Sequence, residues 1–209
     1  EYLEAATRAK DYILHHFIDP EYGGIYWELD YKGNPVDTKK QFYAIGFAIY
    51  GLSEYVRATG DEEALQACMA LYDSIETHSL DREYNGYIEA CTREWGEIAD
   101  MRLSELDANY PKSQNTHLHI IEPYTNLYRC FKELSAQDVV SVPGNKAMLC
   151  KEWQMKVEKS LRNLIDIFCE KILNPETYHL DLFFENDWTR GAGWLESYGH
   201  DIECSWLMQ

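Results

Sequence analysis

The chain has 209 residues, 45% of them hydrophobic, which is enough for one domain with a substantial core. Acidic residues number 36 and basic residues 19, and the resulting formal net charge of −17 repels nucleic-acid phosphates and anionic lipids. We find no signal peptide and no apolar run long enough to cross a bilayer, so we expect a cytoplasmic protein without a nucleic-acid or membrane partner.

In chain order, six segments place apolar residues at helical spacing. They are residues 3–17, 40–58, 62–78, 115–135 and 149–170, and a last helix that begins near His200. Gly60-Asp61 and Gly199 are typical of helix ends. Residues 136–146 contain Pro143-Gly144 and no periodicity, which predicts a surface loop.

A turn-and-strand pattern recurs three times between these helices. Each copy predicts a β-hairpin: a turn, a short strand, a second turn and a return strand. The turns and the segments that follow them are Asp19–Gly24 with Ile25–Asn34, Asp81–Gly86 with Tyr87–Trp95, and Asn174–His179 with Leu180–Trp188.

Helix pairs joined by hairpins at one end predict an all-α fold of the α/α toroid type. Three pairs form about half of a closed ring, so residues 1–209 are expected to be a single partial toroid domain. The chain starts and stops inside helical patterns without caps. We therefore expect a fragment of a longer protein, whose exposed inner helices would favour association.

The six cysteines are scattered and include no C-x-x-C pair. Cys68, Cys130 and Cys169 lie in helical patterns rich in apolar residues. This arrangement predicts buried free thiols in a reducing compartment, with no disulfide framework.

The first candidate site lies in the segment from Asp107 to Glu122. A helix that starts near Asn115 places Asn115, His119, Glu122 and Asn126 on one face, at steps of four, three and four. An ordinary solvent-facing side explains the same pattern, although such faces are commonly rich in Lys and Glu. Pro123 is awkward inside this helix and predicts a kink or the first turn.

The second candidate site is the segment from Ser197 to Glu203 at a helix start. His200 and Glu203 are three residues apart, so a carboxylate could hold the imidazole and raise its basicity. The alternative is a helix N-terminus with acidic residues, which Asp201 and Glu203 satisfy by themselves.

Other chemistries leave weaker traces in the sequence. His117, His119, His200 and Glu203 are suitable zinc or iron ligands, but residues two apart on a helix diverge by roughly 200°. We therefore predict no metal site. We find no nucleophile elbow, phosphate loop or dinucleotide fingerprint. Paired acids such as Asp107 and Glu203 could carry glycoside hydrolysis, which toroids of this shape also host.

Four segments together resemble the N-acylglucosamine 2-epimerase family, and its cellobiose 2-epimerases most closely. They run from Asp107 to Glu122, from Ser197 to Trp206, from Asp37 to Tyr43 and from Asp100 to Glu105. The likeness extends in order over nearly the whole chain. It implies a ring of six helix pairs with the active site at the hairpin end, no metal and no nicotinamide cofactor.

The resemblance also implies a reaction and the residues that carry it. The reaction is inversion at C2 of the reducing-end glucose of a β-1,4-linked disaccharide such as cellobiose, through ring opening and an enediolate. His200 matches an acid/base histidine that Glu203 supports, and His119 matches a histidine near the carbonyl and ring oxygen. Tyr43, Asp107 and Asn115 match substrate-contacting positions, and Glu122, which ends the first signature, is also expected to bind substrate.

Several features depart from the family pattern. The family's catalytic arginine, its second acid/base histidine and its sugar-stacking tryptophans have no counterpart among these residues. N-acylglucosamine and mannose remain alternative sugars, and the oligomeric state is open. A toroidal glycoside hydrolase or a truncated, non-catalytic sugar-binding remnant are the alternative functions.

Overall fold

The computed structural model describes residues 1–141, 145–192 and 195–209. Its helices are α1 (Tyr2–Tyr12), η1 (Ile13–Phe17), α2 (Phe42–Thr59), α3 (Glu62–His78), α4 (Gln114–Ser141), α5 (Asn145–Ile167), η2 (Phe168–Ile172) and α6 (Tyr198–Leu207). All six predicted helices are therefore present. The predicted loop is wrong for residues 136–141 and 145–146, which are helical, and residues 142–144 lie outside the described part.

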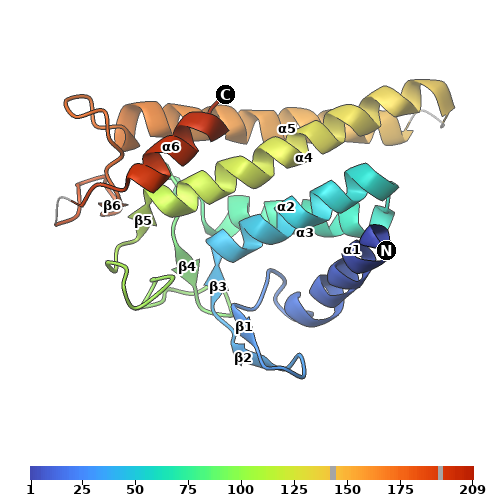
Figure 1. The fold of residues 1–209 in the computed structure, drawn as a ribbon, viewed down its shortest axis with the longest axis horizontal. Helices are drawn as coiled ribbons and strands as arrows, with labels where there is room; N and C mark the ends of the chain where they lie inside the picture. Colours follow the sequence, from blue (N-terminus) through green and yellow to red (C-terminus); the bar gives the residue numbers. More distant parts are fainter. Residues whose placement is uncertain (142–144, 193–194) are drawn as a thin grey trace.

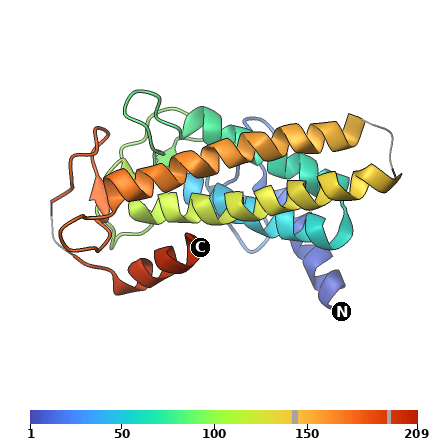
Figure 2. The same cartoon turned by 90° about the horizontal axis from the view of Figure 1, so that it is seen from above.

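The helices form two layers that follow the predicted partial toroid (Figure 1). α4 contacts both α2 and α6, so α2, α4 and α6 make one continuous layer. On the other side, α1 and α3 contact α2, and α5 contacts α4. Figure 2 shows the same order from above, with α4 between α5 and α6. The all-α architecture, with about half of a ring, is confirmed.

Local sequence explains where these helices begin and end. α2 buries Ile45, Ile49, Leu52 and Val56 at helical spacing and ends at Gly60, whose φ of 74° is left-handed. The Asp61 carboxylate accepts the Ala64 amide at 2.8 Å and starts α3. Gly199 lies inside α6, so its predicted role as a helix end is wrong. The side chain of Ser197 caps that helix instead, because a hydroxyl there can accept the amide of His200.

The first of the three predicted hairpins includes a strand pair of its own, β1 (Glu28–Leu29) with β2 (Pro35–Asp37). In the second and third copies, each short strand pairs with the strand that precedes an inner helix. β4 (Ala90–Cys91) pairs with β3 (Lys40–Gln41), and β6 (Phe183–Phe184) pairs with β5 (Lys112–Ser113). The third copy returns through a single bridge, Phe184 with Arg190. An antiparallel bridge closes the turn in every copy, between Ile18 and Ile25, Leu80 and Tyr87, and Leu173 and Leu180. Short hairpins between the helices are therefore confirmed, and in two copies the strand that follows pairs with a distant neighbour instead of a return strand.

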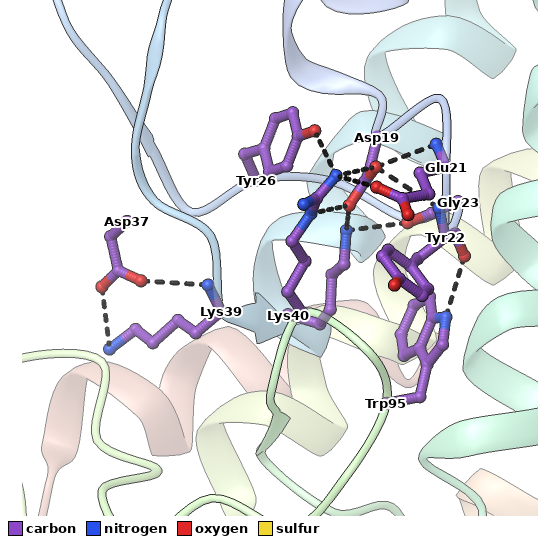
Figure 3. A network of polar contacts seen from close by, with 10 residues as sticks. Asp19, Glu21, Tyr22, Gly23, Tyr26, Asp37, Lys39, Lys40 and Trp95 are labelled. Carbon is purple, nitrogen blue, oxygen red and sulfur yellow. Dashed lines mark hydrogen bonds and ion pairs between the residues drawn. The ribbon is translucent and has the colours of Figure 1, made fainter.

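Buried lysines connect successive copies of the turn pattern (Figure 3). Lys40 Nζ donates to Asp19 Oδ2 at 3.0 Å and to the Gly23 carbonyl at 2.8 Å, and both charged side chains are fully buried. Trp95, from the next copy, covers this lysine and donates its indole N–H to the Tyr22 carbonyl at 2.8 Å. Lys112, Asp81 and Trp188 repeat the arrangement one copy later.

The cysteine prediction is confirmed in part. Cys68 and Cys130 are buried in the core, but Cys169 is exposed, because it lies on the solvent side of η2. Within the described ranges, no helix is both long enough and apolar enough to span a membrane.

Candidate active site

Five of the predicted site residues lie in the first two turns of the inner helices; Glu122 lies one turn further along α4, and Asp107 lies in the segment before β5 (Lys112–Ser113). Tyr43 is the second residue of α2, Asn115 and His119 lie in the first two turns of α4, and His200 and Glu203 lie in the first two turns of α6. The β3–β4 pair ends where α2 begins and the β5–β6 pair ends where α4 begins, so the pairing fixes the positions of these two first turns. Three helices therefore contribute to one end of the half-ring.

His119 is the most enclosed of the predicted catalytic residues. Its side chain is 10% exposed, and its Nδ1 lies 3.2 Å from Glu122 Oε2. On the other side of the ring, Nε2 lies 3.9 Å from Glu203 Oε1. Both ring nitrogens therefore face carboxylates, one from α4 and one from α6. The Nδ1 contact is within hydrogen-bonding distance and the Nε2 contact is longer than a hydrogen bond, so Glu122 is the carboxylate to which Nδ1 can donate.

Two aromatic side chains of α2 close one side of His119. Tyr43 meets the imidazole edge to face at 4.9 Å between ring centroids, and Phe47 lies at 5.1 Å. Burial raises the pKa of the Tyr43 hydroxyl, with further contributions from Glu203 and Glu122. Tyr43 therefore keeps its proton at neutral pH and can donate a hydrogen bond. Phe47 was missed as a site residue, although its spacing of four from Tyr43 could have indicated it.

His200 has a different partner from the one predicted. Within the described part of the chain, the ring of His200 forms no hydrogen bond or ion pair with Glu203. The carboxylate of Glu203 lies near His119 instead. His200 Nδ1 lies 2.7 Å from Nε2 of Gln114, the first residue of α4. Gln114 was not predicted, because no pattern along the chain relates it to His200.

Asn115 and Asp107 share a cavity of about 160 Å³ with His200. Asn115 Oδ1 is buried and has no hydrogen-bond partner within the described part of the chain. Asp107 Oδ2 accepts from the amide and the hydroxyl of Ser104, both at 2.9 Å. The cavity thus offers an unsatisfied amide oxygen and a fixed carboxylate beside an imidazole, a combination that suits a hydroxyl-bearing ligand.

Glu89 also lines this cavity and was missed from the sequence. Its carboxyl group is buried, Oε1 accepts the Ser113 amide at 2.9 Å, and Oε2 accepts the Thr116 hydroxyl at 2.8 Å. Glu89 thus serves as a cap for α4 supplied by another segment. A lone glutamate just before a short strand gives no local signal for such a role.

His117, the remaining histidine of the first candidate segment, and Asn126, predicted on the same helix face as His119, are structural. His117 Nε2 accepts the Tyr87 amide at 2.9 Å, Nδ1 lies 2.6 Å from the Ser113 carbonyl, and burial lowers the pKa of this ring to about 4. Asn126 bonds Ser53 inside the core. His117 and His119 therefore diverge as expected, and the described residues contain no group of three His, Cys, Asp or Glu side chains placed to hold a metal.

Pro123 lies in the interior of α4, so it does not mark the first turn. It has no N–H to give to the carbonyl of His119, four residues earlier. That carbonyl lies against Gly46 of α2, where a Cβ would be only 2.4 Å from the oxygen. A glycine on one helix and a proline on the other therefore set how closely α2 approaches the backbone of His119.

Comparison with known proteins places these features in a family. The sequence profile of the N-acylglucosamine 2-epimerase family matches residues 1–133. A cellobiose 2-epimerase of Bacteroides fragilis is 56% identical over 208 residues, which cover 100% of this chain and 47% of the relative. A cellobiose 2-epimerase of Ruminococcus albus is 39% identical, with the same coverage. The chain thus spans about half the length of the curated relatives it matches.

Solved structures give the same result. The cellobiose 2-epimerase of Spirochaeta thermophila superposes with a TM-score of 0.83 at 35% identity, covering 99% of this chain and 46% of that one. The cellobiose 2-epimerase of Bacillus thermoamylovorans also gives 0.83, at 38% identity, covering 99% and 48%. A D-mannose isomerase at 20% identity has a TM-score of 0.75 and shares the fold.

Proposed function

The chain belongs to the N-acylglucosamine 2-epimerase family, and from that premise we propose that it epimerises C2 of the reducing-end glucose of cellobiose or a related β-1,4-linked disaccharide. The observation that supports this proposal best is the convergence of α2, α4 and α6 on His119. Tyr43 packs against the ring of His119, and Glu122 and Glu203 face its two nitrogens. Three relatives, at 35–56% identity, are named cellobiose 2-epimerases.

The proposed reaction begins with opening of the sugar ring, which exposes an aldehyde at C1. A base then removes the proton on C2, and the electron pair of that C–H bond forms an enediolate with the negative charge on O1. A C2–H bond next to an aldehyde is a weak acid, so the base must act together with donors to the developing oxyanion. Return of a proton to the opposite face of C2 and closure of the ring give the mannose product.

We assign one of the two proton transfers at C2 to His200, whose Nδ1 is occupied by Gln114 and whose Nε2 remains for the substrate. We assign polarisation of the carbonyl, or of the ring oxygen during opening, to His119. Glu122 lies at hydrogen-bonding distance from Nδ1 of His119, and Nε2, which is 3.9 Å from Glu203 and too far for a hydrogen bond to it, is left to act on the substrate. Tyr43, Asp107 and Asn115 supply donors and acceptors for the sugar hydroxyls.

Proton NMR of cellobiose in D2O tests this proposal. The protein should exchange the C2 proton for deuterium and produce mannose-type signals. His200→Ala should lower kcat by about 10²–10⁴-fold, the range that general acid–base catalysis contributes. His15→Ala, an exposed histidine on η1, is the matched control and should leave kcat unchanged.

Other outcomes would identify other functions. Release of glucose without an epimer would indicate a glycoside hydrolase. Sugar binding without any C2 exchange, by a chain that is folded by circular dichroism, would indicate a non-catalytic sugar-binding protein. Full turnover in His200→Ala would remove the role assigned to His200.

A further inference from the structure

Gln114 makes the hydrogen bond that holds the His200 ring, although it belongs to a different helix. The residue is 2% exposed, and its Nε2 lies 2.7 Å from His200 Nδ1. The other atom of the same amide, Oε1, is buried and has no hydrogen-bond partner in the described ranges. A buried acceptor without a partner costs about 1–3 kcal/mol, so it calls for an explanation.

Both residues sit on fixed backbone. The backbone N–H of Gln114 donates to the backbone carbonyl of Leu182 at 2.9 Å, at the point where the β5–β6 pair ends. The first turn of α6 is held by Asp201, whose carboxylate accepts the Leu180 amide at 3.0 Å and lies 2.6 Å from His179 Nδ1. The distance between Gln114 and His200 is therefore set by the scaffold on both sides.

The chemistry proposed for His200 restricts which amide atom can face Nδ1. Because Nδ1 is occupied, Nε2 is the nitrogen that can take a proton from substrate and return it. Nδ1 must then keep its own proton in both states of the ring, and that N–H requires an acceptor. An amide nitrogen cannot accept, but a half-turn about the terminal torsion of Gln114 exchanges the positions of Nε2 and Oε1.

We propose that Gln114 is the positioning residue for His200, and that its Oε1 accepts the Nδ1–H so that Nε2 carries the lone pair. This inference rests on the proposed function of His200 as an acid/base group. The exchange gives Oε1 a donor and places the two N–H groups of Nε2 at the buried position that Oε1 now occupies. The amide also orients the ring without adding a charge, whereas the ring of His119 is held by the carboxylate of Glu122.

The tautomer of His200 tests the inference directly, without requiring turnover. Nitrogen-15 NMR of the histidine-labelled chain, at a pH where the ring is neutral, should show the proton on Nδ1. Gln114→Met keeps the volume but removes the acceptor, so His200 should revert to the Nε2–H form that free imidazole side chains prefer. Gln114→Glu keeps an acceptor and should retain Nδ1–H.

His117 provides an internal reference in the same spectra. Its Nε2 accepts the Tyr87 amide, so its proton must be on Nδ1, and its signals should not move in either variant. A shift of the His117 signals would show that a variant has disturbed the start of α4 as a whole. Nε2–H on native His200, or Nδ1–H retained in Gln114→Met with His117 unchanged, would overturn the inference.

Turnover separates this inference from the proposed function. Gln114→Met should lower kcat within the roughly 10²–10⁴-fold range of acid–base catalysis and leave KM nearly unchanged, with recovery in Gln114→Glu. Native protein that shows Nδ1–H but no C2 exchange would contradict the proposed function and leave the positioning of His200 by Gln114 intact. An unchanged kcat in Gln114→Met of an active protein would contradict the positioning role alone.

Discussion

At the scale of single residues, Glu89 is a carboxyl group whose ionisation is changed by its surroundings. Burial is the main reason that its pKa rises from 4.5 to about 7, although the hydrogen bonds from Thr116 and Ser113 oppose the rise. The nearby Asp107 adds a smaller increase. The folded protein therefore holds the Glu89 proton more tightly than the unfolded chain does, and α4 begins at a group that titrates near neutral pH.

This difference predicts a pH dependence of stability. Below about pH 4.5 both states are protonated and the contribution of Glu89 is fully present; it is lost as the pH rises through 7. The shift corresponds to a loss on the order of 3 kcal/mol in the free energy of unfolding. Glu89→Gln mimics the protonated carboxyl, so its stability relative to the native protein should increase between pH 5 and pH 7.5. Urea denaturation at several pH values measures this, and a pH-independent difference would contradict the raised pKa.

At the scale of elements, the contact between α2 and α4 determines where His119 lies. Gly46 allows the two backbones to approach, and Pro123 leaves the His119 carbonyl without a helical donor. A side chain at position 46 would collide with that oxygen, and it would also be 3.3 Å from Pro123 Cγ. The two helices would then have to separate at the height of the candidate site.

Gly46→Ala should therefore destabilise the protein by about 1–3 kcal/mol, as overpacking in a core does, and should lower any turnover. Gly51→Ala in the same helix is the matched control. Nothing lies within 4 Å of a Cβ there, so this change should stabilise α2 by up to about 1 kcal/mol. Denaturation midpoints of the two variants give the comparison. Equal effects would show that helix propensity, and not the contact with His119, governs position 46.

At the scale of the whole molecule, buried ion pairs join each turn pattern to the next along the half-ring. Asp19 accepts hydrogen bonds from Arg93 at 2.8 and 3.0 Å as well as from Lys40 (Figure 3). Burial by itself would raise the pKa of Asp19, but these bonds hold it well below its usual range. Burial lowers the pKa of Lys40, which the carboxylate of Asp19 opposes.

Asp19→Asn should cost about 3–5 kcal/mol, because it leaves Lys40 buried without its anion. The turn itself should survive. Asn174 occupies the equivalent position of the third copy, and its side-chain oxygen accepts the backbone N–H groups two and three residues later, as Asp19 does in the first copy. Asp37→Asn is the control, because its carboxylate is 40% exposed and 3.9 Å from Lys39 Nζ, and it should change stability by no more than about 1 kcal/mol. A small effect of Asp19→Asn would show that the buried ion pairs between the copies contribute little to the free energy of unfolding.

The sequence by itself determined the helices, the turns and the residue types of the candidate site. Apolar spacing and the Gly60-Asp61 junction are local, and the presence of each helix follows from such local signals, although the loop predicted for residues 136–146 shows that the ends of α4 and α5 did not. The recurring turns are local as well, because an Asp or Asn side chain bonds the amides just after it. The placement of Asn115 and His119 on one helix face needed only the helical period.

Only the tertiary structure decided which of these pieces meet. Strands of two residues contain no pattern that specifies a partner, so the pairing of β5 with β6 could not be read along the chain. Spacing on α6 suggested that Glu203 holds His200, but the neighbouring helix brings His119 to Glu203 and Gln114 to His200. Hydrogen bonds between distant segments depend on how whole helices pack, and that packing cannot be predicted from a local pattern of residue types.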